Sequence, residues 1–292
     1  MNKKYTLITI ATIIIVISII GCITYNKAFN TSNNTNTKPV ELRVSIASSL
    51  IHVAEDMATQ FEKDNNNKVK IILNSDSSST LYTQITTGAP ADVFMSADQK
   101  WTKQLLTNDP GLLNSRYENF TTNSLEIIIA PGNPANITSI ADLAKPGVKL
   151  VLAAPSVPAG SYANSTIWKI DSTWGNPNSA QYITSGVYKN FNASIYQNVV
   201  SYENSVEQVV GKVSLDVGTA DAGIVFVSDG VYGANTGAPV TFIQIPAEVN
   251  TQGIYGIGII DSTQNPELSQ KFMDYWLSKT GKELLTKYGF NS

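Results

Sequence analysis

Short aliphatic runs alternate with amphipathic stretches along most of the chain. Residues 41–47 alternate as a strand does, and Leu50, Val53, Met57 and Phe61 then recur at the spacing of one helical face. We predict further strands over residues 68–73, 92–96, 125–130, 149–154, 222–227 and 240–245, and further helices from residue 81 and over 99–106, 161–170, 205–213 and 266–288. Strands that alternate with helices predict an α/β fold with mostly parallel sheets.

The alternation of strands and helices is interrupted near residues 119–123 and then resumes. We therefore expect two α/β lobes, each with a mostly parallel sheet that is flanked by helices. The first lobe is assembled from residues 40–123 and 239–292, and the second from residues 124–238. In this arrangement the chain crosses between the lobes twice.

A membrane-directed segment precedes the first predicted strand. Two lysines are followed by an almost wholly apolar run over residues 7–23, close to the roughly 18–20 residues of a spanning helix. A cleaved signal peptide and an uncleaved anchor both remain open. The run contains Cys22 after a small residue and so resembles a lipoprotein signal with this thiol as acylation point; alternatively, Cys22 is a small apolar residue of an anchor. We assign residues 1–23 to this segment and residues 24–39 to a flexible polar linker.

The composition narrows the classes of protein that the chain can belong to. With 42% hydrophobic residues in a length of 292, the chain can bury a substantial core, which excludes wholesale disorder. Its 20 basic and 23 acidic residues give a net charge of −3, without the clustered Lys and Arg that binding of nucleic acid requires. One cysteine and one histidine supply neither an intramolecular disulfide nor a common zinc site. We therefore expect a fold that depends on packing alone.

Small residues rich in hydrogen-bond donors lie between several predicted strands and the helices that follow them. These loops are residues 47–49, 76–80, 157–161 and 202–205. Free N–H groups at a helix N-terminus, together with the helix dipole, favour an anion, and ligands of α/β sheets bind at the carboxyl ends of the strands. The sequence therefore predicts an anion site at these loops. The alternative is that Ser49, Ser78 and Ser205 only cap their helices.

A catalytic interpretation of the same region is weaker. His52 follows Ser49 by three residues, as a nucleophile and its base could, but no Gly-x-Ser-x-Gly motif surrounds the serine. A solvated histidine is the simpler interpretation. Acidic pairs at 55–56 and at 203 and 207 could serve acid–base or metal chemistry, but charged residues on exposed helix faces are ordinary. We therefore do not expect an enzyme.

Motifs in the predicted loops together resemble one known family. They are Ala-Ser-Ser-Leu at 47–50, Ser-Ser-Ser-Thr-Leu at 77–81, Gly-Ala-Pro-Ala-Asp-Val-Phe-Met-Ser-Ala-Asp-Gln-Lys-Trp at 88–101, Pro-Ser-Val-Pro-Ala-Gly-Ser-Tyr-Ala at 155–163, Ala-Asp-Ala-Gly-Ile-Val-Phe at 220–226 and Lys-Tyr-Gly-Phe at 287–290. Over nearly all of residues 41–290, the chain resembles the molybdate-binding proteins of ABC importers, members of the type II periplasmic-binding-protein superfamily. The resemblance implies the two-lobed fold of that superfamily, with the ligand in the cleft between the lobes.

The resemblance also implies which residues contact the ligand. In the first lobe these positions are Ser49 and Ser78, which would use hydroxyls and backbone N–H groups. In the second lobe they are Ala159 and Val206, which would use backbone N–H groups. These positions agree with the helix starts found from the pattern of residues alone.

The family's remaining ligand contact is a tyrosine hydroxyl, and at that position this chain has Phe226. The donor is therefore missing. We expect that the site has one hydrogen bond fewer, that Tyr162, Tyr202 or a water molecule replaces the hydroxyl, or that the selectivity differs.

The function that the resemblance implies is transport without catalysis. It implies an exported receptor on the outer face of the cytoplasmic membrane, held by a lipid or helix anchor, that captures molybdate or tungstate and delivers it to the permease of an ABC importer. No cofactor is implied, and we expect a monomer. The alternative within the binding class is a receptor for another tetrahedral oxyanion, such as sulfate or phosphate. The alternative from another class is a secreted hydrolase that uses Ser49 with His52.

Overall fold

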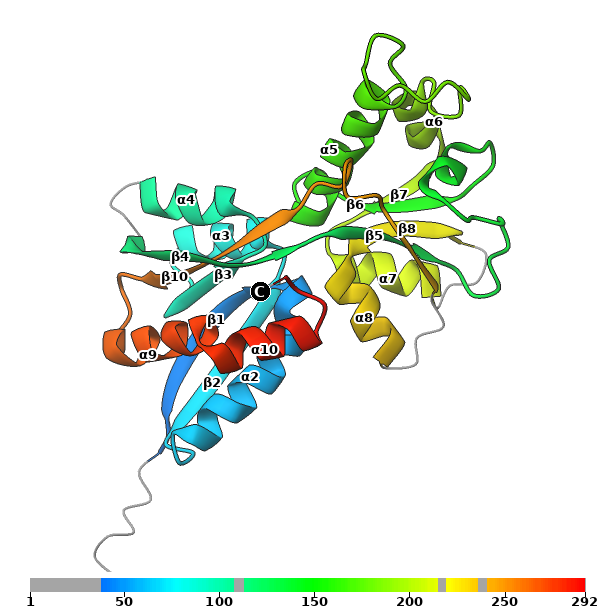
Figure 1. Cartoon of the computed structure of the whole chain (residues 1–292). Coiled ribbons are helices and arrows are strands. Elements are labelled where there is room, and N and C mark those ends of the chain that lie inside the picture. Colours follow the sequence, from blue (N-terminus) through cyan, green and yellow to red (C-terminus); the bar gives the residue numbers. More distant parts are fainter. Residues whose placement is uncertain (1–37, 108–112, 215–218, 236–240, 292) are drawn as a thin grey trace, which may run out of the picture. The chain divides into compact units, whose positions relative to one another are not determined.

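The computed structural model describes residues 38–107, 113–214, 219–235 and 241–291 (Figure 1). The chain divides into two units, Met1–Pro39 and Val40–Ser292, and the fold described below is that of the second unit. Our predictions for residues 1–37, including Cys22 and the membrane-directed segment, lie outside the described residues. Among the helices that are described, none combines the length and the apolar character needed to cross a membrane.

The first sheet has the strand order β2-β1-β3-β10-β4. Its strands are β1 (Val40–Ala47), β2 (Val69–Asp76), β3 (Val93–Ser96), β4 (Leu113–Asn123) and β10 (Gly253–Ile260). Strand β1 runs parallel to β2 and β3, whereas β10 runs antiparallel to both β3 and β4.

Helices cover both faces of this sheet (Figure 1). On one face lie α3 (Ser78–Thr86) and α4 (Gln99–Thr107), and on the other lie α2 (Ile51–Asp64), α9 (Pro266–Leu277) and α10 (Lys279–Lys287). The predicted apolar face of α2 is confirmed, because Val53, Met57 and Phe61 are all buried. Under α3 and α4, a separate apolar cluster includes Leu81 and Phe94.

The second sheet has the strand order β7-β6-β8-β5-β9. Its strands are β5 (Leu125–Ile129), β6 (Leu150–Ala153), β7 (Val199–Glu203), β8 (Ala222–Phe226) and β9 (Thr241–Gln244). Around it lie α5 (Pro158–Thr173), α6 (Phe191–Asn198), α7 (Val206–Ser214) and α8 (Val227–Asn235). Strand β6 is parallel to β7 and β8, and β5 is antiparallel to β8 and β9.

The structure confirms the α/β class with two lobes and corrects one boundary of our prediction. Four strands of each sheet run in the same direction, and one strand is reversed: β10 is antiparallel to β3 and β4, and β5 is antiparallel to β8 and β9. Strand β9 pairs with β5 in the second sheet, although we placed residues from 239 onward in the first lobe. The chain therefore returns to the first lobe only after Gln244.

Three strands, the helices α6 and α8, and the division of the last predicted helix into two were not predicted. Strands β4 and β7 are rich in polar residues, and β10 contains three glycines in its sequence GIYGIGII, which hid its alternation. One of these glycines is required, since a Cβ at Gly256 would lie 2.5 Å from a ring carbon of Tyr117. The helix predicted over 266–288 is two helices, because Ser278 is extended and caps α10 by accepting from the Gly281 N–H.

Two carboxyl groups are buried in the second lobe. Glu126 on β5 is 4% exposed, and its Oε1 has no hydrogen-bond partner among the described residues. Burial raises the pKa of Glu126 to about 8. Burial also raises the pKa of Asp229 on α8 well above its ordinary value. Glu126 is therefore predominantly protonated at neutral pH, and burial favours the neutral form of Asp229 in the same way, which avoids an unpaired buried charge.

The raised pKa of Glu126 predicts that stability declines as the pH rises. Between the ordinary pKa of 4.5 and the folded value of about 8, the native state binds more protons than the unfolded state, so the free energy of unfolding falls with pH. We expect Glu126→Gln to flatten this decline, and to raise stability near pH 8.5 by at least about 1 kcal/mol. Calorimetric unfolding at a series of pH values measures both effects.

The exposed Glu248 offers a matched control, since Glu248→Gln should leave the pH dependence as in the wild type. Asp229 should preserve part of the decline in both variants. A Glu126→Gln curve that runs parallel to the wild-type curve at all pH values would contradict the prediction.

Candidate functional site

One small pocket brings together the five positions that the family resemblance assigned to the ligand site. The first lobe lines it with Ala47, Ser48, Ser49, Ser77, Ser78 and Ala97, and the second lobe with Val157, Pro158, Ala159, Val206 and Phe226. The pocket therefore lies at the carboxyl ends of β1, β2, β3, β6 and β8. Its cavity volume is about 10 Å³, room for about one water molecule.

The N-terminal ends of four helices lie at this pocket. Ser49 lies in a short 3₁₀ turn (Ser48–Leu50) that leads directly into α2, and Ser78 is the first residue of α3. Ala159 is the second residue of α5, and Val206 is the first residue of α7. The first N–H groups of a helix have no acceptor within that helix, and the positive end of the helix dipole lies there. The pocket is therefore surrounded by backbone donors from both lobes.

The sequence analysis left open that Ser49, Ser78 and Ser205 are only helix caps. Of these three serines, one is a helix cap. Ser205 Oγ accepts from the Gln208 N–H at the start of α7. The cap of α3 is Ser77, whose Oγ accepts from the Thr80 N–H, and not Ser78. Ser49 makes no side-chain cap at all. The hydroxyls of Ser49 and Ser78 are therefore not used as caps.

Both of these hydroxyls have a partner that orients them. Ser78 is fully buried, and its Oγ accepts from the Ala97 N–H at 3.0 Å, which leaves its own proton for another acceptor. Ser49 Oγ lies 2.9 Å from the hydroxyl oxygen of Tyr255 on β10. The sequence analysis missed Tyr255 because it missed the strand; the alternation of Tyr255, Ile257 and Ile259 with glycines was the available signal.

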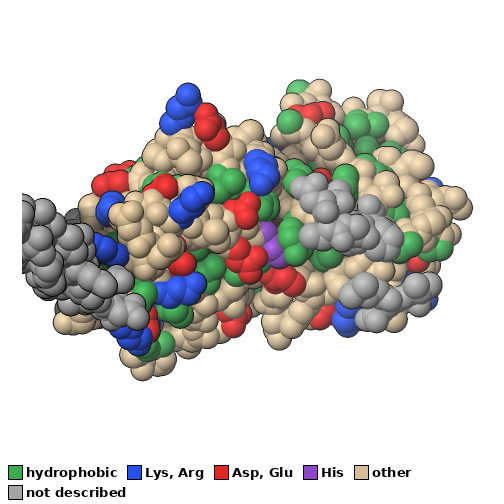
Figure 2. Space-filling view, turned by 90° about the horizontal axis from the view of Figure 1, so that it is seen from below, with side chains coloured by type: hydrophobic (Ala, Val, Ile, Leu, Met, Phe, Trp, Pro, Cys, Tyr) green, Lys and Arg blue, Asp and Glu red, His purple; other side chains and the backbone are tan. Residues whose placement is uncertain are grey.

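Among the residues that the structure describes, no charged side chain lines the pocket. The imidazole of His52 stacks on Tyr232 of α8 with an angle of 4° between the ring planes, and burial lowers the pKa of His52 to about 4. Figure 2 shows this histidine among acidic side chains at the surface. Asp229 Oδ2 accepts from the Phe226 N–H, and burial raises the pKa of this carboxyl well above its ordinary value, which favours its neutral form. The site therefore relies on neutral donors.

The structure does not assemble the catalytic groups considered from the sequence. Ser49 bonds to Tyr255, whereas the ring of His52 stacks on Tyr232, so the two are not paired as nucleophile and base. Asp56 accepts from Lys287 and Tyr288 at the surface. Within the described ranges, no group of three or more His, Cys, Asp or Glu residues could hold a metal ion.

The two tyrosines that we considered as substitutes for the hydroxyl missing at Phe226 do not line the pocket. The ring of Tyr162 packs edge-on against Phe226, with 6.1 Å between the ring centroids. Burial raises the pKa of the Tyr162 hydroxyl, and the negative charge of the nearby Asp98 carboxylate raises it further. Tyr202 is 49% exposed on β7. The tyrosine hydroxyl that does reach the serines is that of Tyr255.

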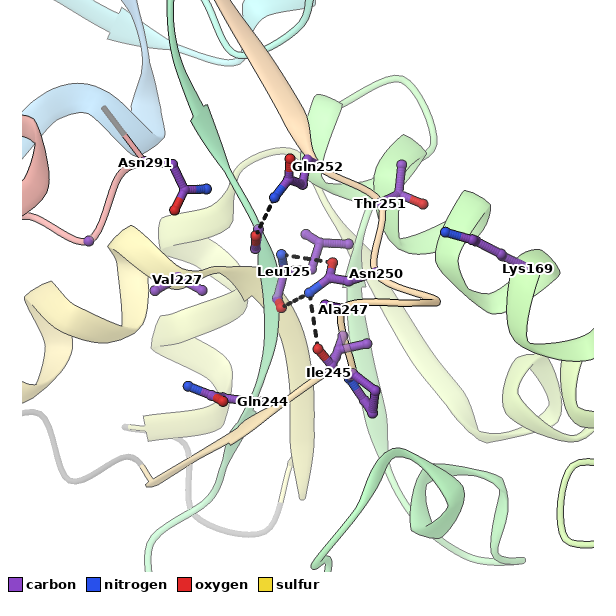
Figure 3. A pocket seen from close by; sticks show the side chains of 13 residues that line it. Leu125, Lys169, Val227, Gln244, Ile245, Ala247, Asn250, Thr251, Gln252 and Asn291 are labelled. Atoms are coloured by element: carbon purple, nitrogen blue, oxygen red, sulfur yellow. Dashed lines mark hydrogen bonds between the residues drawn. The ribbon is translucent and has the colours of Figure 1, made fainter. Parts of the chain in front are cut away.

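A larger groove lies elsewhere, along the two segments that connect the lobes (Figure 3). It has a volume of about 980 Å³ and contains none of the predicted ligand contacts. Asn250 joins the two connections: its Oδ1 accepts from the Leu125 N–H, and its Nδ2 donates to the carbonyls of Leu125 and Ile245. Gln252 Nε2 donates to Ser124 Oγ in the same place. This groove therefore lies beside the two connections between the lobes.

Known proteins resemble this chain over most of its length. The family described as bacterial extracellular solute-binding protein matches residues 42–291. The "Molybdate-binding protein ModA" of Mycobacterium tuberculosis H37Rv is 34% identical over 247 residues, which are 85% of this chain and 83% of that protein. The "Putative ABC transporter substrate-binding lipoprotein YvgL" of Bacillus subtilis 168 is 27% identical over the whole of both chains.

The solved structures agree with this relationship. The substrate-binding domain of a putative molybdenum ABC transporter from Clostridium difficile is 26% identical, with a TM-score of 0.62, and the alignment covers 87% of this chain and 99% of that domain. The family match covers nearly the whole of Val40–Ser292, and one relative is 34% identical. This chain belongs to the bacterial extracellular solute-binding proteins and is a binding protein, not an enzyme.

Proposed function

We propose that this protein captures molybdate or tungstate outside the cytoplasm and delivers the anion to the permease of an ABC importer. The observation that carries the proposal is the convergence of four helix starts, from both lobes, on one pocket without charged side chains. The names of the relatives support molybdate as the ligand. Tungstate is included because it is nearly the same size and shape.

The donors of the pocket suit a dianion. In the proposed complex the hydroxyls and N–H groups of Ser49 and Ser78, with the N–H groups of Ala159 and Val206, donate to the oxyanion. Hydrogen bonds to a charged acceptor are about twice as strong as those between neutral groups, and the helix dipoles add to them. The low polarity around the pocket strengthens each bond further, because little water competes there. Lysine or arginine is therefore not needed.

Selectivity in such a pocket depends on size and protonation. A ring of donors set for molybdate leaves long bonds around the smaller sulfate and phosphate ions. Phosphate also carries a proton near neutral pH and needs an acceptor, which a site composed of donors does not provide. We therefore propose that sulfate and phosphate bind weakly, although a receptor for one of these ions is the alternative within the same class.

Binding requires the lobes to separate and close again. The cavity of about 10 Å³ is too small for an oxyanion, and its lining comes from both lobes. The two connections joined by Asn250 provide a place for the hinge. We propose that the closed, loaded form is the one that the permease recognises, since the ligand would stabilise closure by contacting both lobes.

The finer location of the protein is also part of the proposal. We propose that the apolar segment over residues 1–23 exports the chain, that Cys22 is acylated, and that residues 24–39 tether a monomeric receptor to the outer face of the cytoplasmic membrane. The B. subtilis relative is named a lipoprotein, which supports the acylation of Cys22.

Calorimetric titration with four anions tests the proposed ligand. The full-length chain, kept in detergent because of its apolar segment and stripped of bound anion, is titrated with molybdate, tungstate, sulfate and phosphate in turn. We expect tight binding of the first two and weak or absent binding of the others. Sulfate or phosphate binding more tightly than molybdate would establish the alternative, and no binding of any of the four would overturn the anion site itself.

Replacement of one buried serine tests the donors of the pocket. Hydrogen bonds to charged groups contribute about 1.5–3 kcal/mol, so Ser78→Ala should weaken molybdate binding roughly tenfold to a hundredfold. The control is Ser214→Ala, because Ser214 is also buried but its Oγ donates to Val210 within its own helix. Equal affinities of the two variants would exclude the Ser78 hydroxyl as a ligand contact.

A further inference from the structure

Tyr255 is held rigidly behind the pocket. It lies on β10 with no exposed surface. Phe120, Phe226 and Phe290 contact its ring edge-on, with centroid distances of 6.3, 5.7 and 5.4 Å. A ring enclosed in this way has little rotational freedom, so the position of its hydroxyl is set by the core.

The hydroxyl of Tyr255 belongs to a chain of hydrogen bonds. Asn123 Nδ2 lies 3.4 Å from it and, as an amide N–H group, can only donate. Tyr255 Oη accepts from Asn123, which leaves its own proton available for Ser49 Oγ, 2.9 Å away. If Tyr255 donates to Ser49, Ser49 keeps its own proton for an acceptor in the pocket. Burial raises the pKa of Tyr255 well above its ordinary value, so this hydroxyl retains its proton.

The same chain of hydrogen bonds reaches the second lobe. Asn123 Nδ2 also donates to Ser228 Oγ at 2.8 Å, and Ser228 is the second residue of α8. Asn123 is the last residue of β4, immediately before the connection into the second lobe. The network therefore joins Ser49 in the first lobe to α8 in the second through the segment that links the two lobes.

We propose that Tyr255 is a positioning residue for anion binding, which commits the Ser49 hydroxyl to donate into the pocket. Because the proton of Tyr255 occupies one lone pair of Ser49 Oγ, the serine is less able to accept a hydrogen bond from a protonated ligand. Tyr255 thereby acts on specificity as well as affinity. The inference rests on the proposed function, because it requires an oxyanion in the pocket.

The variant Tyr255→Phe removes the hydroxyl and keeps the ring in its aromatic surroundings. In the full-length chain in detergent, we expect molybdate to bind about tenfold more weakly, as measured by calorimetric titration. We also expect the ratio of molybdate to phosphate affinity to fall, because Ser49 regains an acceptor site. The control is Tyr196→Phe, whose hydroxyl bonds to Asn164 outside the pocket and whose loss should change neither value.

A double-mutant cycle with Ser49→Ala separates positioning from a structural role. If Tyr255 acts through Ser49, Tyr255→Phe should cause no further loss of molybdate affinity once Ser49 is alanine. An equal loss in both backgrounds, or no loss in either, overturns the inference. Wild-type protein that binds none of the anions would instead refute the proposed function, so the two failures are distinguishable.

A second variant keeps the test valid if Tyr255→Phe does not fold. Asn123→Leu leaves the tyrosine in place and removes the donor that directs its hydroxyl. We expect a smaller loss of molybdate affinity of the same kind, which disappears in the Ser49→Ala background. A loss that persists in that background, or no loss at all, again overturns the inference.

Discussion

The site depends on the N–H groups of the first turn of a helix, which have no acceptor in their own helix. Ser78 and Val206 begin helices, and Ala159 is the second residue of one, each at the end of a strand. A pocket formed by such groups, without a charged side chain, is electrostatically positive but carries no net charge. A dianion can satisfy several of these donors at once, so the arrangement of helices defines the class of ligand.

Close packing holds these helix starts in place. A Cβ at Gly160 would lie 2.2 Å from the carbonyl oxygen of Ala154, so only glycine allows α5 to begin so near the end of β6. The neighbouring Ala159 is thereby placed at the pocket. On the side of the first lobe, Ser78 accepts from the Ala97 N–H and is fixed in the same way. The two lobes meet at this point and are joined by the connections that Asn250 ties together.

Much of this arrangement could be predicted from local pattern. Strand–loop–helix units and the donor-rich loops between them have a strong local signal, and Ser49, Ser78, Ala159, Val206 and Phe226 do line one pocket. The prediction was wrong where the local signal was weak or ambiguous. Glycines hid β10, the apolar pattern continued through the break at Ser278, and nothing in β9 showed which sheet it would join.

By itself, the sequence determined the α/β class, the helix starts and the neutral donors, because each is encoded within a few neighbouring residues. Only the tertiary structure decided that the sheets are mixed, that the chain returns after Gln244, and that Tyr255 orients Ser49. The physical reason is distance along the chain. Ser49 and Tyr255 are 206 positions apart, and a hydrogen bond between them exists only because β10 inserts between β3 and β4.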